Sequence, residues 1–582
     1  MISFKHKTIS TKGLIGCGLT AVLALMGCAD WNDHYDQNTS VLGSQQSSLW
    51  ENIENNGQLT QFASLLKKAG YDKILQGSQT YTVWAPVDGS FDYDALTATE
   101  GSLLLKEFIQ NHVARNNYPA SGTINNLPIY MLNEKMMHFD GSGAYTMQGV
   151  SVAQPNLASS NGTIHTLNGK LPFMQNIYES LFDKTYPLDS IANYFQRYDI
   201  KEIDPNRSVA GPIINGELTY LDTVYNENNI LFRLFHADIQ QEDSNFTMIV
   251  PTNDAWNKAK ATISKYYNYI PSFEFMKNTE TGTNRELTKI EILDTDFLKD
   301  SVVNMNLVRD LFYNNNLYDH KKLNNLQEGQ VLQCDSLYST TFSKIYSEDA
   351  AALFTGMHRA DKSNGTVWIT DTLRMHPWTS WNPEIKIEAE MATYVSSYSN
   401  VAESDKNARV RVLPSTQNPA VTGTISNDAY LEVPSISTAT NPGVVFYLPD
   451  VRSTTYKVGI VIVPANIIST YVTPKPNYFN VTMGYADETG KNIDNYRDWR
   501  YLDYFESNIE KVDTIWLGEM TFPIAYIGTD SYPYIRVTSA IRAAQRDTYD
   551  RTLRIDCLIL RPKELADYIE AHPDYKYDDG KY

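Results

Sequence analysis

The sequence predicts a multidomain protein of mixed α+β and all-β class, in which two α/β domains precede a β-sandwich. Three observations lead to this prediction. The chain has 582 residues, and domains usually hold about 100–200 residues each. Helix-like and strand-like patterns alternate up to about residue 380. Beyond Trp381, short strands with alternating apolar residues and turn signals replace them.

Composition and charge narrow the classes of function. The chain is 42% hydrophobic and contains 39 Tyr and 9 Trp, whereas disordered chains are poor in aromatic residues. Its formal net charge is −19, and no stretch provides the basic face that would neutralise phosphates. We therefore expect a folded protein that does not bind nucleic acid.

The N-terminus has the features of a bacterial signal peptide. Basic residues precede an apolar run from Leu14 to Gly27, and Cys28 follows it. This run is shorter than the ~20 apolar residues of a transmembrane helix. No later segment reaches that length, so no membrane-spanning helix is expected.

The sequence Leu25-Met26-Gly27-Cys28 resembles the lipobox of bacterial lipoproteins. The resemblance implies that residues 1–27 are removed as a signal peptide and that Cys28 is lipidated, which anchors the protein to a membrane. A secretory signal followed by a chance cysteine is the alternative. Residues 1–27 hold three lysines and no acidic residue, so their removal changes the net charge to −19 − 3 = −22.

Residues 28–48 are polar and predict a tether. Three acidic residues follow the cysteine closely, at Asp30, Asp33 and Asp36. This pattern resembles the surface-export signal of lipoproteins in the Bacteroidetes. The resemblance implies an outer-membrane protein exposed at the cell surface.

The first predicted domain covers residues 49–182. A helical pattern up to Ala69 is followed by a β-rich run at 81–86, a helix at 103–113 and further strands. The runs YTVWAPVDGSF and NGTIHTLN, with Asn111-His112 between them, resemble the hallmark blocks of the fasciclin (FAS1) domain, a small α/β fold.

A second copy is predicted over residues 183–380. Residues 230–235 resemble the opening helix, 246–256 the first block, 307–313 the central helix and 363–371 the closing block. The two histidines of the family are absent, because Asn314 and Trp368 stand where they are expected. A long insertion is expected between Asn257 and Ser301.

The third predicted domain covers residues 381–565, where many short strands without intervening helices indicate a sandwich or jelly roll. The runs IEAE, AYLEVP and RIDCLIL resemble carbohydrate-binding jelly rolls of the galactose-binding-like kind. Residues 566–582 are expected to form a polar, frayed tail.

Three acidic residues of this domain are candidate metal ligands. Glu388 and Glu390 alternate along one strand and so share a face. The jelly-roll resemblance implies that Asp556 joins them around a structural calcium ion, which takes oxygen ligands. A solvated strand face and a glycosidase-like acid/base pair are the alternatives.

Other side chains carry weaker signals. His112 and His165 are expected to be buried, hydrogen-bonded residues that tie the last strand to the central helix, because no nucleophile accompanies them. Exposed aromatic rings can bind sugars, although core packing is the alternative for each of four tryptophans: Trp378, Trp381, Trp499 and Trp516.

Together these patterns predict a non-enzymatic cell-surface lipoprotein, with no catalytic residues, that mediates adhesion or protein binding. In the Bacteroidetes, such lipoproteins resemble accessory subunits of uptake systems built on a TonB-dependent transporter and its lipoprotein lid. The alternative is a surface glycan-binding protein that acts through the C-terminal β-sandwich. Calcium is the one cofactor the sequence suggests.

Overall fold

The computed structural model describes residues 47–206, 208–214, 216–277, 286–317, 321–401, 410–414, 416–496, 504–526 and 533–577. The chain divides into two compact units. The first contains the residues up to Gln175 together with Asp199–Asn228 and Gln241–Asp243. The second contains Asn176–Tyr198, Asn229–Gln240 and the chain from Ser244 onward.

The first unit is built on a seven-stranded sheet of order β2-β1-β7-β6-β5-β4-β3. Its central strands β1 and β7 are parallel and fully buried. The strands are β1 (Tyr81–Pro86), β2 (Val113–Arg115), β3 (Thr123–Tyr130), β4 (Met136–Ser142), β5 (Ala144–Met147), β6 (Val150–Ser159) and β7 (Gly162–Leu167).

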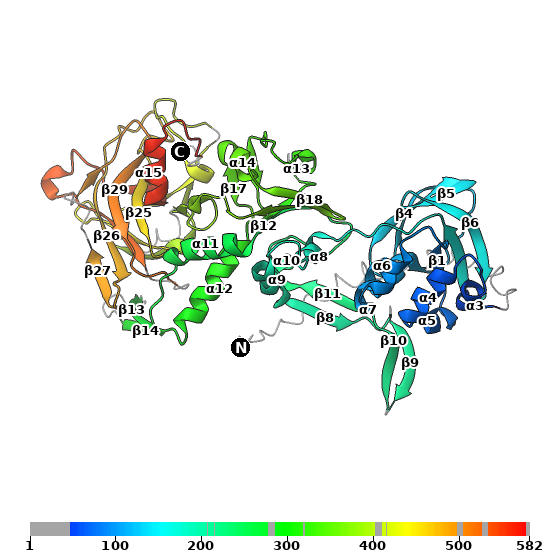
Figure 1. The fold of residues 1–582 in the computed structure, drawn as a ribbon. Coiled ribbons are helices and arrows are strands. Elements are labelled where there is room, and N and C mark those ends of the chain that lie inside the picture. Colours follow the sequence, from blue (N-terminus) through cyan, green and yellow to red (C-terminus); the bar gives the residue numbers. More distant parts are fainter. Residues whose placement is uncertain are drawn as a thin grey trace, which may run out of the picture. The chain divides into compact units, whose positions relative to one another are not determined.

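Helices cover one face of this sheet (Figure 1). They are α3 (Leu49–Glu54), α4 (Thr60–Lys68), α5 (Asp72–Gln76), α6 (Tyr93–Ala98) and α7 (Gly101–Leu103). A π-helical stretch (Leu104–Ile109) and a 3₁₀ turn (Gln110–His112) complete the helix predicted at 103–113. Alternate residues of β1 face different cores: Val83 packs with the helices, whereas Trp84 packs with the strands β3–β5.

Four more strands belong mainly to the first unit although they lie inside the second predicted domain. β8 (Asp199–Ile203) pairs with β11 (Tyr225–Asn229), and β9 (Val209–Ile214) forms a hairpin with β10 (Glu217–Asp222). Val209 packs against the helical core of the first unit. This insertion could not be predicted from the sequence, because alternation alone does not identify the sheet that a strand joins.

The second unit repeats the first arrangement. Its four-stranded sheet has the order β15-β12-β19-β18, which matches β2-β1-β7-β6. The parallel register Phe246↔Gly365 corresponds to Tyr81↔Gly162. The strands are β12 (Phe246–Pro251), β15 (Phe312–Asn314), β18 (His358–Lys362) and β19 (Gly365–Thr370), with β16 (Ser336–Tyr338) and β17 (Lys344–Tyr346) paired nearby.

The helices of this repeat begin earlier than the sequence predicted. Asn176 and Glu179 form a capping box that opens the first helix, whose residues Ile177 and Tyr178 are buried. The second unit includes residues from Asn176 onward, before the predicted start at residue 183. The helices are α8 (Ile177–Ser180), α9 (Asp189–Gln196), α10 (Ile230–Leu234), α11 (Asn253–Ile263), α12 (Thr295–Val308), α13 (Lys321–Asn325) and α14 (Ser347–Leu353).

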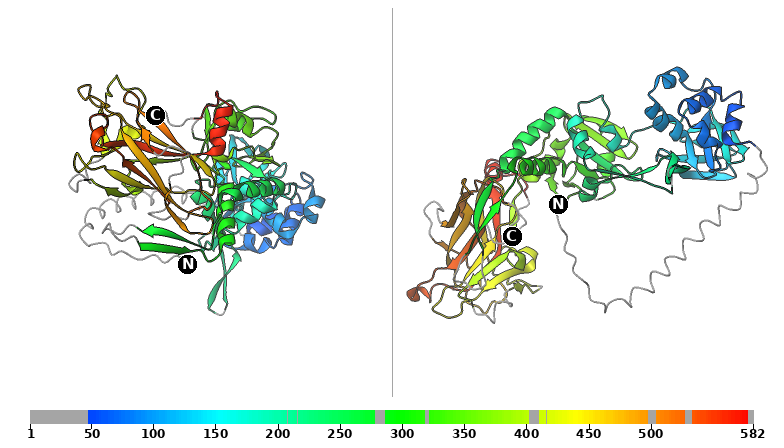
Figure 2. Two further views of the ribbon diagram at one scale, coloured as in Figure 1. Left: turned by 90° about the vertical axis from the view of Figure 1, so that its left-hand side faces the viewer. Right: turned by 90° about the horizontal axis from the view of Figure 1, so that it is seen from below.

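The C-terminal part is all-β, and its two six-stranded sheets are consistent with a sandwich, as predicted. One sheet runs β22-β23-β31-β25-β29 with β20 beside β31; the other runs β21-β24-β30-β26-β27 with β28 beside β26. These strands, yellow-green to red in Figure 2, share one hydrophobic core.

The strands of the two sheets have the following bounds: β20 (Ile385–Glu388), β21 (Val395–Ser399), β22 (Val410–Val412), β23 (Ala429–Val433), β24 (Gly443–Tyr447), β25 (Thr455–Ile462), β26 (Tyr478–Ala486), β27 (Asn492–Tyr496), β28 (Phe505–Glu506), β29 (Asp513–Thr521), β30 (Tyr534–Ser539) and β31 (Leu553–Pro562).

The insertion expected between Asn257 and Ser301 joins this sandwich. It contains the hairpin β13 (Ser272–Lys277) and β14 (Glu286–Glu291). Phe273 is buried in the sandwich core, and the Glu274 amide donates a hydrogen bond to the Gly490 carbonyl at 2.8 Å. Phe273 therefore packs the inserted hairpin against the sandwich within the second compact unit.

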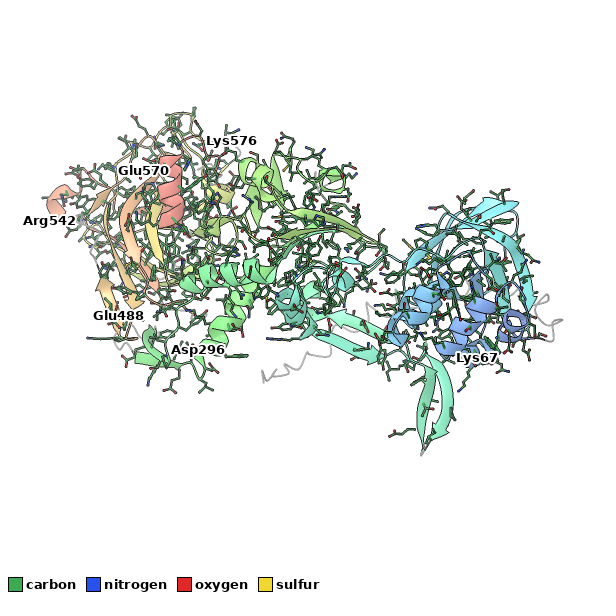
Figure 3. All side chains as sticks on the ribbon, viewed as in Figure 1. Lys67, Asp296, Glu488, Arg542, Glu570 and Lys576 are labelled. Atoms are coloured by element: carbon green, nitrogen blue, oxygen red, sulfur yellow. The ribbon has the colours of Figure 1, made fainter. Side chains whose placement is uncertain are left out.

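The segment expected to be a frayed tail, residues 566–582, begins within helix α15 (Lys563–Ala571), and the structure describes it as far as residue 577. Tyr575 is buried and accepts a hydrogen bond from Trp378 Nε1 at 3.2 Å, and Glu564 accepts one from the Tyr266 hydroxyl at 2.9 Å. These contacts explain why a polar sequence stays in place here. By contrast, charged residues such as Lys67 on α4 and Asp296 on α12 project outward (Figure 3).

Candidate functional site

The predicted lipidation site lies outside the described residues, as do the signal peptide and nearly all of the tether. Among the described residues, no helix is both long and apolar enough to cross a bilayer. Of the two cysteines in the described chain, Cys557 is buried and Cys334 is partly buried.

The structure brings the three predicted carboxylates together around one loop. The Ser426 amide donates to Asp556 at 3.1 and 3.2 Å, and the Ser426 hydroxyl donates to Glu388 Oε1 at 2.8 Å. The Asn427 amide nitrogen donates to Glu390 Oε1 at 3.3 Å. Antiparallel pairing of β20 with β31 sets Glu388 opposite Cys557, next to Asp556.

A lysine shares this cluster. Lys386 Nζ lies 2.8 Å from Glu388 Oε1 and donates to the Ser426 hydroxyl at 2.5 Å. Burial, with the nearby charges of Glu388 and Glu390 adding to it, raises the pKa of Asp556 to about 8. Asp556 therefore holds a proton at neutral pH. Burial also raises the pKa of Glu390.

The fit of this cluster to calcium is incomplete. The second oxygens of Glu388 and Glu390 are buried without a hydrogen-bond partner, and such oxygens are the ligands that calcium takes. However, no group of three or more acidic, histidine or cysteine residues in the described chain is arranged to hold a metal ion. Lys386 occupies the cluster, so a calcium ion would have to displace its ammonium group.

The two histidines lie in different cores of the first unit. His112 packs against Phe62 and Phe108 among the helices, whereas His165 stacks on Trp84 and packs against Phe139 on the other side of the sheet. They do not form a pair, which removes the arrangement that acid–base chemistry between them would need.

Each histidine is neutral and fixed by backbone groups. His112 Nδ1 donates to the Phe108 carbonyl at 2.7 Å, and its Nε2 accepts from the Leu171 amide at 2.9 Å. His165 Nε2 donates to the Tyr118 carbonyl at 2.9 Å, and its Nδ1 accepts from the Asn156 amide at 3.3 Å. Burial lowers the pKa of each to about 4.

The register corrects one sequence-based position in the second repeat. Met248↔Phe312 corresponds to Val83↔Val113, so Leu311 takes the place of His112, and Asn314 corresponds to Arg115. Asn314 was therefore the wrong equivalent. Ile249↔Trp368 corresponds to Trp84↔His165, so Trp368 does replace His165.

In each repeat, an Asn-Gly pair connects the helices to a central strand. This role could not be predicted from the sequence. Asn161 Oδ1 accepts from the amide of Leu49 at the start of α3, and its Nδ2 donates to the Leu75 carbonyl in α5. Asn364 binds the corresponding backbone groups, the Ile177 amide and the Ile239 carbonyl. The helices are thus tied to the start of a central strand in each repeat.

The glycine of each pair is required by close backbone contact. A Cβ atom on Gly162 would lie 1.9 Å from the carbonyl oxygen of Tyr81, and one on Gly365 would lie 1.9 Å from that of Phe246. The φ angles of the two glycines, +152° and +141°, also disfavour other residues.

Of the four tryptophans considered for sugar binding, three lie among the described residues. Trp378 and Trp381 are buried. Trp516 is half-buried, with Lys457 and Arg561 over its ring at 4.9 and 5.0 Å. Trp499 lies outside the described residues.

Comparison with known proteins places a fasciclin domain at residues 57–171, which match the family model of that name. No curated protein matches the chain. A solved FAS1 domain pair from the insect cell adhesion molecule fasciclin I is 12% identical, with 56% of this chain and 99% of that chain covered and a TM-score of 0.18.

A second solved structure, Paenibacillus xanthan lyase, is 13% identical, with 41% of this chain and 19% of that chain covered and a TM-score of 0.17. Scores this low do not establish a shared fold over the aligned lengths.

Proposed function

We propose that this chain is a lipid-anchored cell-surface protein that mediates adhesion or protein binding and has no catalytic activity. The observation that carries the proposal is the fasciclin domain at residues 57–171, a type of domain often associated with adhesion. The matching strand order and register of the second unit support a second domain of the same type.

The absence of catalysis is part of the proposal. Its support is that His112 and His165, the most prominent polar residues of the fasciclin domain, are neutral, backbone-bound and in separate cores. Glu388 is paired with Lys386 and accepts a hydrogen bond from Ser426, and Glu390 accepts one from Asn427, which favours a structural role for both carboxylates.

The partner that we propose is an outer-membrane uptake complex, a TonB-dependent transporter with its lipoprotein lid, for which this chain would be an accessory subunit. The signal-like N-terminus, the cysteine at position 28 and the acidic residues behind it support the location. Cys28 would supply the membrane attachment through its acyl chains.

The anchor is tested by acylation of Cys28. We expect the wild-type protein to incorporate a labelled fatty acid in its own host and to begin at Cys28 when its mature mass is measured. Cys28→Ser should abolish the label, whereas Cys334→Ser, which changes a partly buried cysteine of the second unit, should keep it. An unlabelled wild-type protein would instead favour an ordinary secretory signal.

A second candidate function is glycan binding by the sandwich. It is favoured by a surface stack of tyrosines, in which the rings of Tyr478 and Tyr504 are 5.3 Å apart and nearly parallel, with Tyr549 at 5.0 Å from Tyr478. Tyr504 is 41% exposed, and an exposed ring offers an apolar face to a sugar. Affinity gels that contain plant and host polysaccharides separate this function from protein binding.

A further inference from the structure

The hairpin β9–β10 extends away from the body of the first unit (Figure 1). Near its turn, Ile213 and Leu218 lie directly opposite each other, so their side chains share one face. They are 71% and 50% exposed, and the neighbouring Ile214 is exposed as well. Among the described residues β9 and β10 pair only with each other, so the hairpin presents apolar side chains outside any larger sheet.

The base of this hairpin is fixed although its tip is exposed. Val209 packs against the helical core of the first unit. The hydroxyl of the buried Ser208 donates to the Asp204 carbonyl at 2.7 Å and accepts from the Val224 amide at 2.9 Å. These bonds join the two ends of the hairpin where it leaves the unit. The apolar tip therefore stands on a fixed support, which lowers the entropy cost of binding.

The charges around the tip limit the kind of partner. Residues 199–228 contain six acidic and two basic residues, and the stretch from Ala210 to Tyr220 has Glu217 as its one charge. Lys201, one of the two basic residues, is paired with Glu227. An acidic arm is repelled by an anionic lipid surface and by the identical arm of a second copy. A protein pocket that is apolar inside and basic at its rim complements both features of the arm.

We infer that the tip of β9–β10 docks into an apolar pocket with a basic rim on another protein, with Ile213 and Leu218 as the side chains buried there. Clustered exposed apolar side chains mark interaction sites on soluble proteins, and a few buried side chains carry most of the binding energy at such interfaces. This contact rests on the proposed protein binding and gives it a surface. It does not depend on the anchor at Cys28.

The test places a photoreactive amino acid at position 213 of the full chain in its own host. Position 436 is the matched control, because Ile436 is 56% exposed in the C-terminal part. We expect irradiation to join position 213, but not position 436, to one other protein, which mass spectrometry identifies. That protein, once purified, should bind the purified mature chain saturably and more weakly as the salt concentration rises.

Two substitutions then measure the contribution of the tip. Ile213→Ser and Leu218→Ser should each weaken binding of the identified protein about 10-fold, whereas Ile436→Ser should bind as the wild type does. The unfolding temperature of all three variants should stay close to that of the wild type, because the replaced side chains are exposed.

The inference is overturned if irradiation joins position 213 to lipid, to a second copy or to nothing beyond the control. It is also overturned if both tip variants bind as tightly as the wild type, or if binding does not respond to salt. When position 213 gives no product but other proteins still co-purify with the chain, the docking site fails and the proposed protein binding stands. When nothing cross-links or co-purifies, both fail.

Discussion

Acidification from pH 7 to pH 4 is expected to destabilise the first unit far more than the second repeat. His112 and His165 have pKa values of about 4 in the folded protein, below the ordinary value of 6.5, because burial disfavours the charged ring. The unfolded chain therefore binds more protons than the folded one between these values. Stability is fully present above pH 6.5 and is lost as the pH falls towards 4.

The size of this effect follows from the two shifts. Each histidine contributes about 3 kcal/mol to the free energy of unfolding at neutral pH, and the pair about 6 kcal/mol. Because small domains are stable by only about 5–15 kcal/mol, this loss removes a large part of the stability of the unit. The second repeat has Leu311 and Trp368 at the same positions and lacks this source of acid sensitivity.

Thermal unfolding followed between pH 7 and pH 4 checks this expectation. The transition that contains the first unit should move to lower temperature far more than the other one. His112→Gln should reduce the pH dependence of that transition by about half, whereas His572→Gln, at an exposed residue, should leave it unchanged. Equal acid sensitivity of both transitions would contradict the structural role of the buried histidines.

The sandwich is expected to respond to pH in the opposite direction through Asp556. Its pKa of about 8 in the folded protein lies above the ordinary 3.8, because burial, with Glu388 and Glu390 nearby, disfavours the carboxylate. The folded state keeps the proton that the unfolded state loses, so stability falls as the pH rises from about 4 to 8. The expected loss by pH 7 is on the order of 4 kcal/mol.

Asp556→Asn removes the titrating group but keeps an acceptor for the Ser426 amide. The variant should be more stable than the wild type at pH 8, and its second unit should show a flatter pH profile by differential scanning calorimetry. Asp547→Asn, at a side chain that is 90% exposed, is the control. A variant less stable than the wild type at pH 8 would contradict the protonated state of Asp556.

The same calorimetric experiment tests whether the cluster binds the predicted calcium ion. If calcium displaces Lys386 and binds Glu388, Glu390 and Asp556, its addition at pH 8 should raise the unfolding temperature of the wild type but not that of Asp556→Asn. Because Lys386 neutralises the cluster, we expect calcium to change the unfolding temperature of the wild type only slightly.

The sequence predicted the strands of the sandwich and the order of elements in the fasciclin domain, because alternation and the Asn-Gly-x-Ile-His block are local signals. It also named the three carboxylates that meet in space. It could not supply the register, which is why Asn314 was aligned with His112 where pairing places Leu311.

Long-range packing accounts for the other differences. The β8–β11 segment lies between α9 and α10 in the sequence but joins the first unit, and the polar tail is held by Trp378.

The proposed function is tested most directly by purifying the tagged, lipidated protein from the outer membranes of its own host in mild detergent. We expect a large β-barrel and its lipoprotein lid to purify with it in constant proportion. Recovery of the protein alone, with lipid attached and both units folded, would contradict its role as a subunit of an uptake complex and would leave a free-standing adhesin or glycan-binding protein.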